Sequence, residues 1–171
     1  MQISVTENHI IITSVEHAAV SQPVAFLQEQ GFEVTILPVD GHGVVKLDAL
    51  EKALRPDTIL VSTMMVNNET GAVMPVEKIG AMIQEKCPKA LYHVDAIQAF
   101  GKYRIYPKKW NIHLLSVSSH KIHGPKRSWI PVHQQQGKKY SLSFSAAASR
   151  TACVPEQTTY RESQDLALQR R

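Results

Sequence analysis

A serine, a histidine and a lysine gather at the end of an apolar run, in the segment Ser118-Ser119-His120-Lys121. A lysine amine that follows a buried strand can lose its proton near neutral pH, as a nucleophilic amine must. With a serine three residues before it and a histidine beside it, Lys121 suits a Schiff base to an aldehyde cofactor. The other interpretation is a surface lysine that happens to follow a strand.

A carboxylate closes a second apolar run twenty-six residues earlier, at Asp95. Pyridoxal phosphate (PLP) chemistry needs a lysine for the aldehyde. It also needs a carboxylate that keeps the pyridine nitrogen protonated, so that the ring can accept electrons. Asp95 and Lys121 together therefore predict a PLP site. Taken alone, an aspartate at the end of a strand is commonly a helix cap.

The composition is that of an ordinary soluble globular protein of 171 residues, with 43% hydrophobic and 20% charged residues. No apolar run approaches the ~20 residues of a membrane span. The net charge of +4 comes from scattered basic residues, so we expect neither a nucleic-acid nor a membrane partner. Two cysteines fit neither a disulfide scaffold nor a metal site, which favours a cytoplasmic location.

Strand-like and helix-like segments alternate up to about residue 120. The patterns predict strands at 9–13, 33–39, 58–65, 91–94 and 113–117, and helices at 15–30, 47–54 and 75–86. Strands that are apolar on both faces and separated by helices predict an α/β fold, with a mostly parallel sheet flanked by helices. Ligands of such sheets gather at the carboxyl ends of the strands, where Asn67-Asn68, Asp95 and Ser118 to Lys121 all fall.

Four motifs follow one another along the chain: Thr13-Ser14-Val15-Glu16-His17, Val66-Asn67-Asn68-Glu69-Thr70-Gly71, His93-Val94-Asp95-Ala96-Ile97-Gln98 and Ser116-Val117-Ser118-Ser119-His120-Lys121. In this order and spacing they resemble the motifs of the cysteine desulfurases, PLP enzymes of fold type I in the class V aminotransferase family. The resemblance covers residues 9–126 and implies a partial PLP-binding large domain at 1–126.

The resemblance implies two catalytic residues. Lys121 would hold the cofactor as a Schiff base and later move protons on the substrate. His17 would lie flat over the cofactor ring, whereas a histidine that opens a helix is otherwise a common polar cap.

Further residues are implied to bind the cofactor. Asp95 would pair with the pyridine nitrogen, and Gln98 and Asn68 would hydrogen-bond the side of the ring that carries the phenolic oxygen. Ser118 and His120 would contact the phosphate, because hydroxyl and imidazole donors suit an oxyanion. Taken singly, the two amides could also be loop residues that satisfy the backbone.

The implied reaction removes sulfur from L-cysteine and gives L-alanine and an enzyme persulfide. The family also implies a homodimer and a sulfur-acceptor or scaffold protein, as in iron–sulfur cluster assembly. Neither cysteine can be placed as the persulfide carrier: Cys87 ends a predicted helix and is expected to be a packed thiol, and Cys153 lies beyond the matched residues. Selenocysteine lyases and other class V members share the four motifs, so they remain alternatives.

The chain departs from the family pattern at both ends. The N-terminal phosphate-binding loop, the catalytic cysteine loop and the small C-terminal domain have no counterpart here, so we expect little turnover from this chain alone. A non-catalytic truncated product or an association module is the alternative.

The residues after Lys126 also depart from the family. Read from the second base of each codon, Arg127 to His133 can encode Gly-Val-Gly-Phe-Leu-Tyr, the strand that the family has there. We therefore expect residues 127–171 to be an out-of-frame, poorly ordered tail. A genuine variant tail is the alternative.

Overall fold

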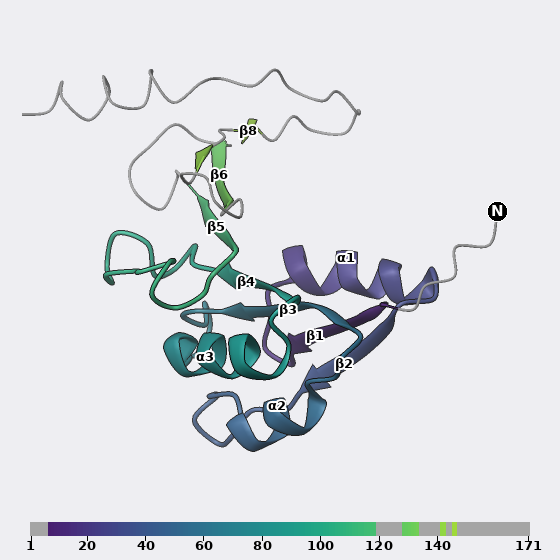
Figure 1. Cartoon of the computed structure of the whole chain (residues 1–171). Helices are drawn as coiled ribbons and strands as arrows, with labels where there is room; N and C mark the ends of the chain where they lie inside the picture. Colours follow the sequence, from purple (N-terminus) through teal and green to yellow (C-terminus); the bar gives the residue numbers. More distant parts are fainter. Residues whose placement is uncertain (1–6, 119–127, 134–140, 143–144, 147–171) are drawn as a thin grey trace, which may run out of the picture.

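The computed structural model describes residues 7–118, 128–133, 141–142 and 145–146. Five parallel strands form the main sheet in the order β2-β1-β3-β4-β5, with α1 on one face and α2 and α3 on the other (Figure 1). This arrangement confirms the predicted α/β class and mostly parallel sheet. The elements are β1 (His9–Thr13), α1 (Ala18–Glu29), β2 (Glu33–Leu37), α2 (Leu47–Ala53), β3 (Thr58–Met64), α3 (Val76–Lys86), β4 (Leu91–Asp95) and β5 (Leu114–Ser118).

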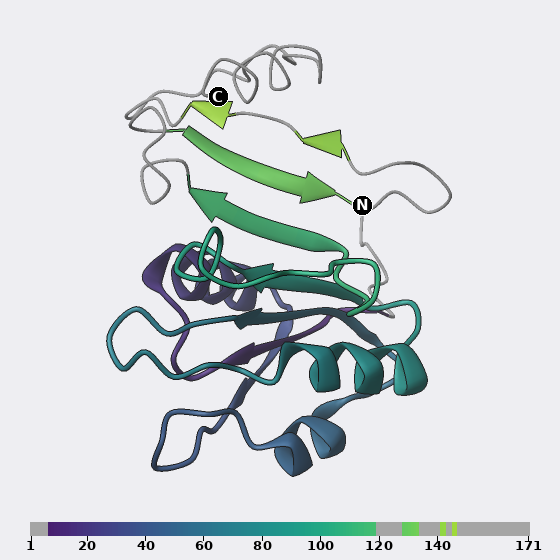
Figure 2. The ribbon, with the colours of Figure 1, turned by 90° about the vertical axis from the view of Figure 1, so that its left-hand side faces the viewer.

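Three further strands extend the sheet beyond β5 and run antiparallel to their neighbours. The strand β6 (Ser128–His133) pairs with β5, so that Ser118 lies opposite Trp129 (Figure 2). The short strands β7 (Ser141–Leu142) and β8 (Ser145–Ala146) both pair with β6. These strands fall in the segment 127–171, whose other residues lie outside the described ranges, and its assignment as an out-of-frame tail stays a prediction.

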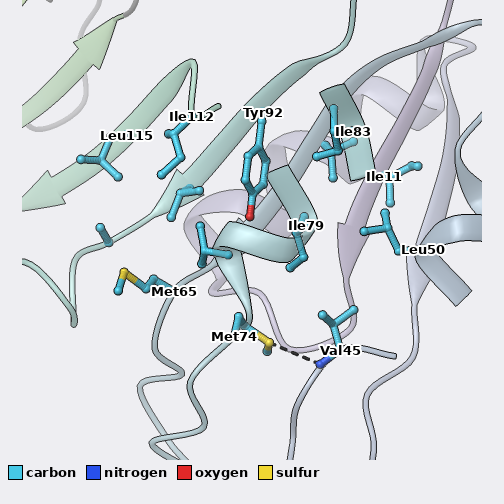
Figure 3. Close-up of a cluster of buried hydrophobic side chains, with 14 of the residues drawn as sticks. Ile11, Val45, Leu50, Met65, Met74, Ile79, Ile83, Tyr92, Ile112 and Leu115 are labelled. Atoms are coloured by element: carbon cyan, nitrogen blue, oxygen red, sulfur yellow. Dashed lines mark hydrogen bonds between the residues drawn. The ribbon is translucent and has the colours of Figure 1, made fainter. Parts of the chain in front are cut away.

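The larger hydrophobic core lies between the sheet and the helices α2 and α3. Tyr92 lies in the middle of this core, fully buried among aliphatic side chains such as Ile79 and Ile83 (Figure 3). A smaller cluster of Ile10, Ile12 and Val24 lies under α1. The consecutive residues Ile10, Ile11 and Ile12 alternate between the two clusters, as the two-residue period of a strand requires.

The face of the sheet toward α1 is more polar than the sequence predicted. The His93 imidazole bridges two serines of neighbouring strands, with Nδ1 2.8 Å from Ser62 Oγ and Nε2 2.8 Å from Ser116 Oγ. On the opposite face, which β1 shares through Ile11 with α2 and α3, His9 bridges Thr58 and Thr35 in the same way. These hydrogen bonds offset the free-energy cost of removing the polar groups from water, so the strands need not be apolar on both faces.

The helices themselves are short. The longest described helix, α1, has 12 residues, and none in the described ranges is long and apolar enough to cross a membrane. The sequence predicted that α1 begins at residue 15, whereas it begins at Ala18. The reason is local, because the His17 side chain accepts a hydrogen bond from the Ala19 N–H and so acts as the N-cap.

Candidate functional site

Four of the predicted site residues lie at the carboxyl ends of the adjacent strands β1, β3, β4 and β5. Asp95 and Ser118 are the last residues of β4 and β5, and His17 and Asn68 lie in the loops that follow β1 and β3. Adjacent strands are about 4.8 Å apart, and parallel strands end at the same edge of a sheet. The fold therefore brings these four residues to one edge, where Gln98 also follows β4.

Asp95 is the buried carboxylate of this edge, with 5% of the residue exposed. Its Oδ1 accepts a hydrogen bond of 3.0 Å from the Ile97 N–H. No lysine, arginine or histidine of the described residues forms an ion pair with it. A buried carboxylate normally has a cationic or donor partner. Asp95 therefore fits a protonated ring nitrogen, which is what PLP would bring.

The His17 imidazole lies exposed at the first turn of α1. Its Nδ1 accepts the Ala19 N–H at 3.1 Å, so the sequence alternative of a polar cap is also present in the structure. This bond uses only one ring nitrogen and leaves the faces of the ring uncovered by it. The capping role therefore fixes the imidazole without preventing it from covering a cofactor ring.

Two neighbouring asparagines behave differently after β3. Asn67 is buried, and its Oδ1 accepts hydrogen bonds from the backbone N–H groups of Glu69 and Thr70 at 2.9 and 2.8 Å. The Asn68 side chain is exposed and makes no hydrogen bond to the described residues, and the same holds for the amide of half-buried Gln98. These two amides are thus available to a ligand, although their predicted role toward a cofactor stays a prediction, while Asn67 shapes the loop.

Glu16 also lies at this edge, and no role was predicted for it. Its Oε1 accepts hydrogen bonds from the Thr13 hydroxyl and from the Met64 N–H, and its Oε2 is buried without a partner among the described residues. Burial raises the pKa of the Glu16 carboxyl to about 7, and the negative charge of Asp95 adds to the rise. The sequence signal that could have indicated a role for Glu16 is its position directly before His17, the histidine predicted to cover the cofactor ring.

His120 and Lys121 lie outside the described residues, so the structure does not place the predicted Schiff-base lysine. Ser118 precedes them as a buried residue at the end of β5. The roles of all these residues toward a cofactor stay predictions.

Cys87 has the surroundings of a packed thiol. It is buried at the end of α3, and its Sγ–H donates to the Arg55 carbonyl at 3.1 Å. Burial raises the pKa of this thiol above its usual value. Since the thiolate is the nucleophilic form, Cys87 is unsuited to carry a persulfide.

The sequence profile of the family described as Aminotransferase class-V matches residues 3–127. The mitochondrial cysteine desulfurase of Candida albicans is 50% identical over 121 residues, which are 71% of this chain and 24% of that protein. The cysteine desulfurase IscS of Methanosarcina thermophila is 50% identical over 118 residues, 69% of this chain and 29% of that protein. The chain thus spans about a quarter of the length of the curated relatives it matches.

Solved structures agree with the sequence comparisons. A structure titled NIFS-like protein superposes with a TM-score of 0.73 at 40% identity, and the match covers 80% of this chain and 37% of that one. Another, titled SspA in complex with cysteine, gives a TM-score of 0.67 at 40% identity over 70% of this chain and 34% of that one. At this identity the likeness extends to the sequence and is not confined to the fold.

Proposed function

Because this chain belongs to the class V aminotransferase family, we propose that it forms the cofactor-binding core of a PLP-dependent cysteine desulfurase. One observation carries the proposal: at one edge of a parallel sheet lie a fixed imidazole, a buried carboxylate that forms no ion pair with the described residues, and two amides that make no hydrogen bond to them. The substrate would be L-cysteine, in keeping with the names of the relatives.

The Asp95 side chain would accept a hydrogen bond from the protonated ring nitrogen. Its position on β4 suits this task, because Oδ1 is already held by the Ile97 N–H and the carboxylate cannot turn away freely. Bound PLP would supply an electron sink for bond cleavage next to the substrate nitrogen. The imidazole of His17, held by its cap bond, would cover one face of the ring and exclude water from it.

The remaining residues would orient the cofactor. The amides of Asn68 and Gln98, which make no hydrogen bond to the described part of the chain, would donate toward the phenolic oxygen side of the ring. Ser118 and His120 would donate to the phosphate, and the Lys121 amine would hold the aldehyde and later carry a proton to or from the substrate. Together these residues would fix the ring at the carboxyl edge of β3, β4 and β5.

The test is PLP binding by the purified chain. Titration with PLP should produce the visible absorption band of a lysine-bound cofactor, and Lys121→Ala should abolish that band. Lys102→Ala changes an exposed lysine in the loop after β4 and serves as the matched control, because it should leave the band intact. Absence of a band in folded wild-type protein would contradict the proposal.

A second variant tests the role of the Asp95 carboxylate independently of Lys121. Asp95→Asn keeps an oxygen for the Ile97 N–H and removes the charge, so the protein should fold and bind PLP more weakly. Unchanged PLP affinity in Asp95→Asn would argue against the proposed contact with the ring nitrogen.

For the chain by itself we expect little alanine release from L-cysteine, because Cys87 is buried and no other described residue is a cysteine. A robust yield of alanine would overturn this expectation. Assays of sulfide and selenide release would distinguish a desulfurase from a selenocysteine lyase. Dimer formation, a sulfur-acceptor partner and a cytoplasmic location remain proposals, and several relatives carry the word mitochondrial in their names.

A further inference from the structure

The Glu16 carboxyl joins two strands at the proposed cofactor edge. Its Oε1 accepts one hydrogen bond from the hydroxyl of Thr13, the last residue of β1. It accepts a second, at 2.8 Å, from the N–H of Met64, the last residue of β3. The second bond spans 48 residues of sequence. Met64 is also the register partner of Asp95 on β4. Glu16 thus attaches the turn that carries His17 to the strand next to Asp95.

The other carboxyl oxygen, Oε2, is buried and has no hydrogen-bond partner among the described residues. A bare carboxylate oxygen in such a place carries charge without solvation, and a buried charge without a partner is strongly unfavourable. A proton on Oε2 removes that charge. It leaves Oε1 free to accept the bonds from Thr13 and Met64.

The charged and titratable neighbours favour the same protonation state. From β4, the negative charge of Asp95 adds to the rise in the pKa of Glu16, whereas burial raises the pKa of the Tyr92 phenol, which therefore brings no charge. No lysine or arginine of the described residues acts on the carboxyl. Two carboxylates that repel each other seldom ionise together, and the buried Oε2 without a hydrogen-bond partner among the described residues favours the proton on Glu16.

We propose that Glu16 is a positioning residue of the cofactor site, and that it works as a neutral carboxylic acid with its proton on Oε2. The link to PLP rests on the proposed function, whereas the protonation state does not. A neutral Glu16 holds the His17 turn against β3 without placing a second negative charge beside Asp95. A neutral Glu16 therefore does not repel the Asp95 side chain that would face a protonated ring nitrogen.

The expected pH dependence follows from burial, which raises the pKa of Glu16 to about 7 from its usual value of 4.5. Between these pH values the folded chain binds a proton that the unfolded chain has lost. The contribution of Glu16 to stability is therefore complete at pH 4.5 and is lost as the pH rises through about 7. Glu16→Gln keeps an acceptor oxygen and cannot ionise, so this loss should vanish.

The first experiment needs no cofactor. Infrared spectra at pH 6 should show a carboxylic C=O band that Glu16→Gln removes and Glu29→Gln keeps, since Glu29 is exposed at the end of α1. Unfolding midpoints between pH 5 and pH 8 should show wild type losing stability relative to Glu16→Gln, with Glu29→Gln parallel to wild type. Parallel curves for Glu16→Gln and wild type, or a band that survives the substitution, would overturn the neutral-acid assignment.

A second variant covers the case in which Glu16→Gln does not fold. Thr13→Val preserves the branched shape and removes a hydrogen bond that lowers the pKa of Glu16. The pH at which the infrared band disappears should therefore move upward in Thr13→Val. A downward shift, or none, would count against the proposal.

PLP affinity tests the link to the site. From pH 6 to pH 8.5, wild type should lose several-fold in affinity relative to Glu16→Gln, because its second carboxyl ionises and Glu16→Gln has none. Equal affinities at every pH would overturn the positioning role. If neither protein binds PLP while the infrared and unfolding differences appear, the proposed function fails and the neutral acid stands.

Discussion

The Asn67 side chain donates a hydrogen bond from Nδ2 to the backbone carbonyl of Val15 at 3.0 Å, across 52 residues of sequence. This bond joins the loop after β3 to the turn after β1, so the two loops that carry Asn68 and His17 are held together. The Oδ1 of the same amide accepts the N–H groups of Glu69 and Thr70. Asn67 therefore organises the edge at which its neighbour Asn68 is free to bind.

Because the two asparagines differ in this way, alanine substitution should lower stability at Asn67 and weaken PLP binding at Asn68. Asn67→Ala leaves several polar groups without partners and should lower the free energy of unfolding by about 1–3 kcal/mol. Asn68→Ala removes an exposed amide and should change stability by less than about 0.5 kcal/mol while weakening PLP binding. Denaturant unfolding without PLP, followed by PLP titration, measures both. A larger stability loss in Asn68→Ala than in Asn67→Ala would refute this division.

Adding one methyl group at Gly80 on α3 should cause a large loss of stability. A Cβ at this position would lie 1.9 Å from the carbonyl oxygen of Trp110, which is backbone and cannot rotate away. Although alanine is favoured over glycine in a helix by about 1 kcal/mol, Gly80→Ala should destabilise the fold by about 2 kcal/mol or more. Gly41→Ala is the control, because no atom lies within 4 Å of its added Cβ. Thermal unfolding of the two variants should separate them clearly.

Because His93 is buried, we expect the fold to lose stability in acid. Burial lowers the pKa of its imidazole, and the charge of Asp95 only partly opposes this shift. In the unfolded chain the pKa of His93 is 6.5, so below this pH the unfolded chain binds a proton that the folded chain does not. The contribution of His93 to stability is therefore fully present above pH 6.5 and falls as the pH decreases. His93→Gln should make the unfolding midpoint less dependent on pH between 6.5 and 5.

A matched comparison isolates this term from the other titrating groups. Glu16 acts with the opposite sign in an overlapping pH range, and burial also lowers the pKa of His9 and His113. Only the difference between His93→Gln and wild type is therefore informative. His42→Gln changes an exposed histidine in a turn and should follow wild type. If both variants gave the same curve, His93 would not be a source of the acid sensitivity.

The helices and strands could be predicted from the sequence because their apolar spacing is local. The strand at 9–13 was predicted at its observed bounds, and Asp95 was expected at the end of a strand, where it lies. The start of α1 was missed because it depends on a side chain, that of His17, which caps the helix three residues later than the apolar pattern suggested.

Contacts between strands could not be predicted in the same way. The Ser62–His93–Ser116 bridge depends on which strands are neighbours and on their register, and neither is written in one segment alone. The contact of Glu16 with the Met64 N–H has the same origin. The motifs thus predicted the edge of the sheet at which the proposed site residues lie, whereas the groups that hold this edge together could be identified only in the folded arrangement.

Cys87 predicts how the chain responds to thiol reagents. Its Sγ–H is bonded to the Arg55 carbonyl, the residue is buried, and burial raises the pKa of the thiol, so little thiolate is present at pH 7.5. In a Cys153→Ser background, Cys87 is the single thiol of the chain. Alkylation by iodoacetamide should then be at least about tenfold slower in buffer than in denaturant, because it requires local opening of the end of α3. Rapid alkylation of the folded protein, or a persulfide on Cys87 after incubation with PLP and L-cysteine, would show that this thiol is accessible and would restore it as a sulfur carrier.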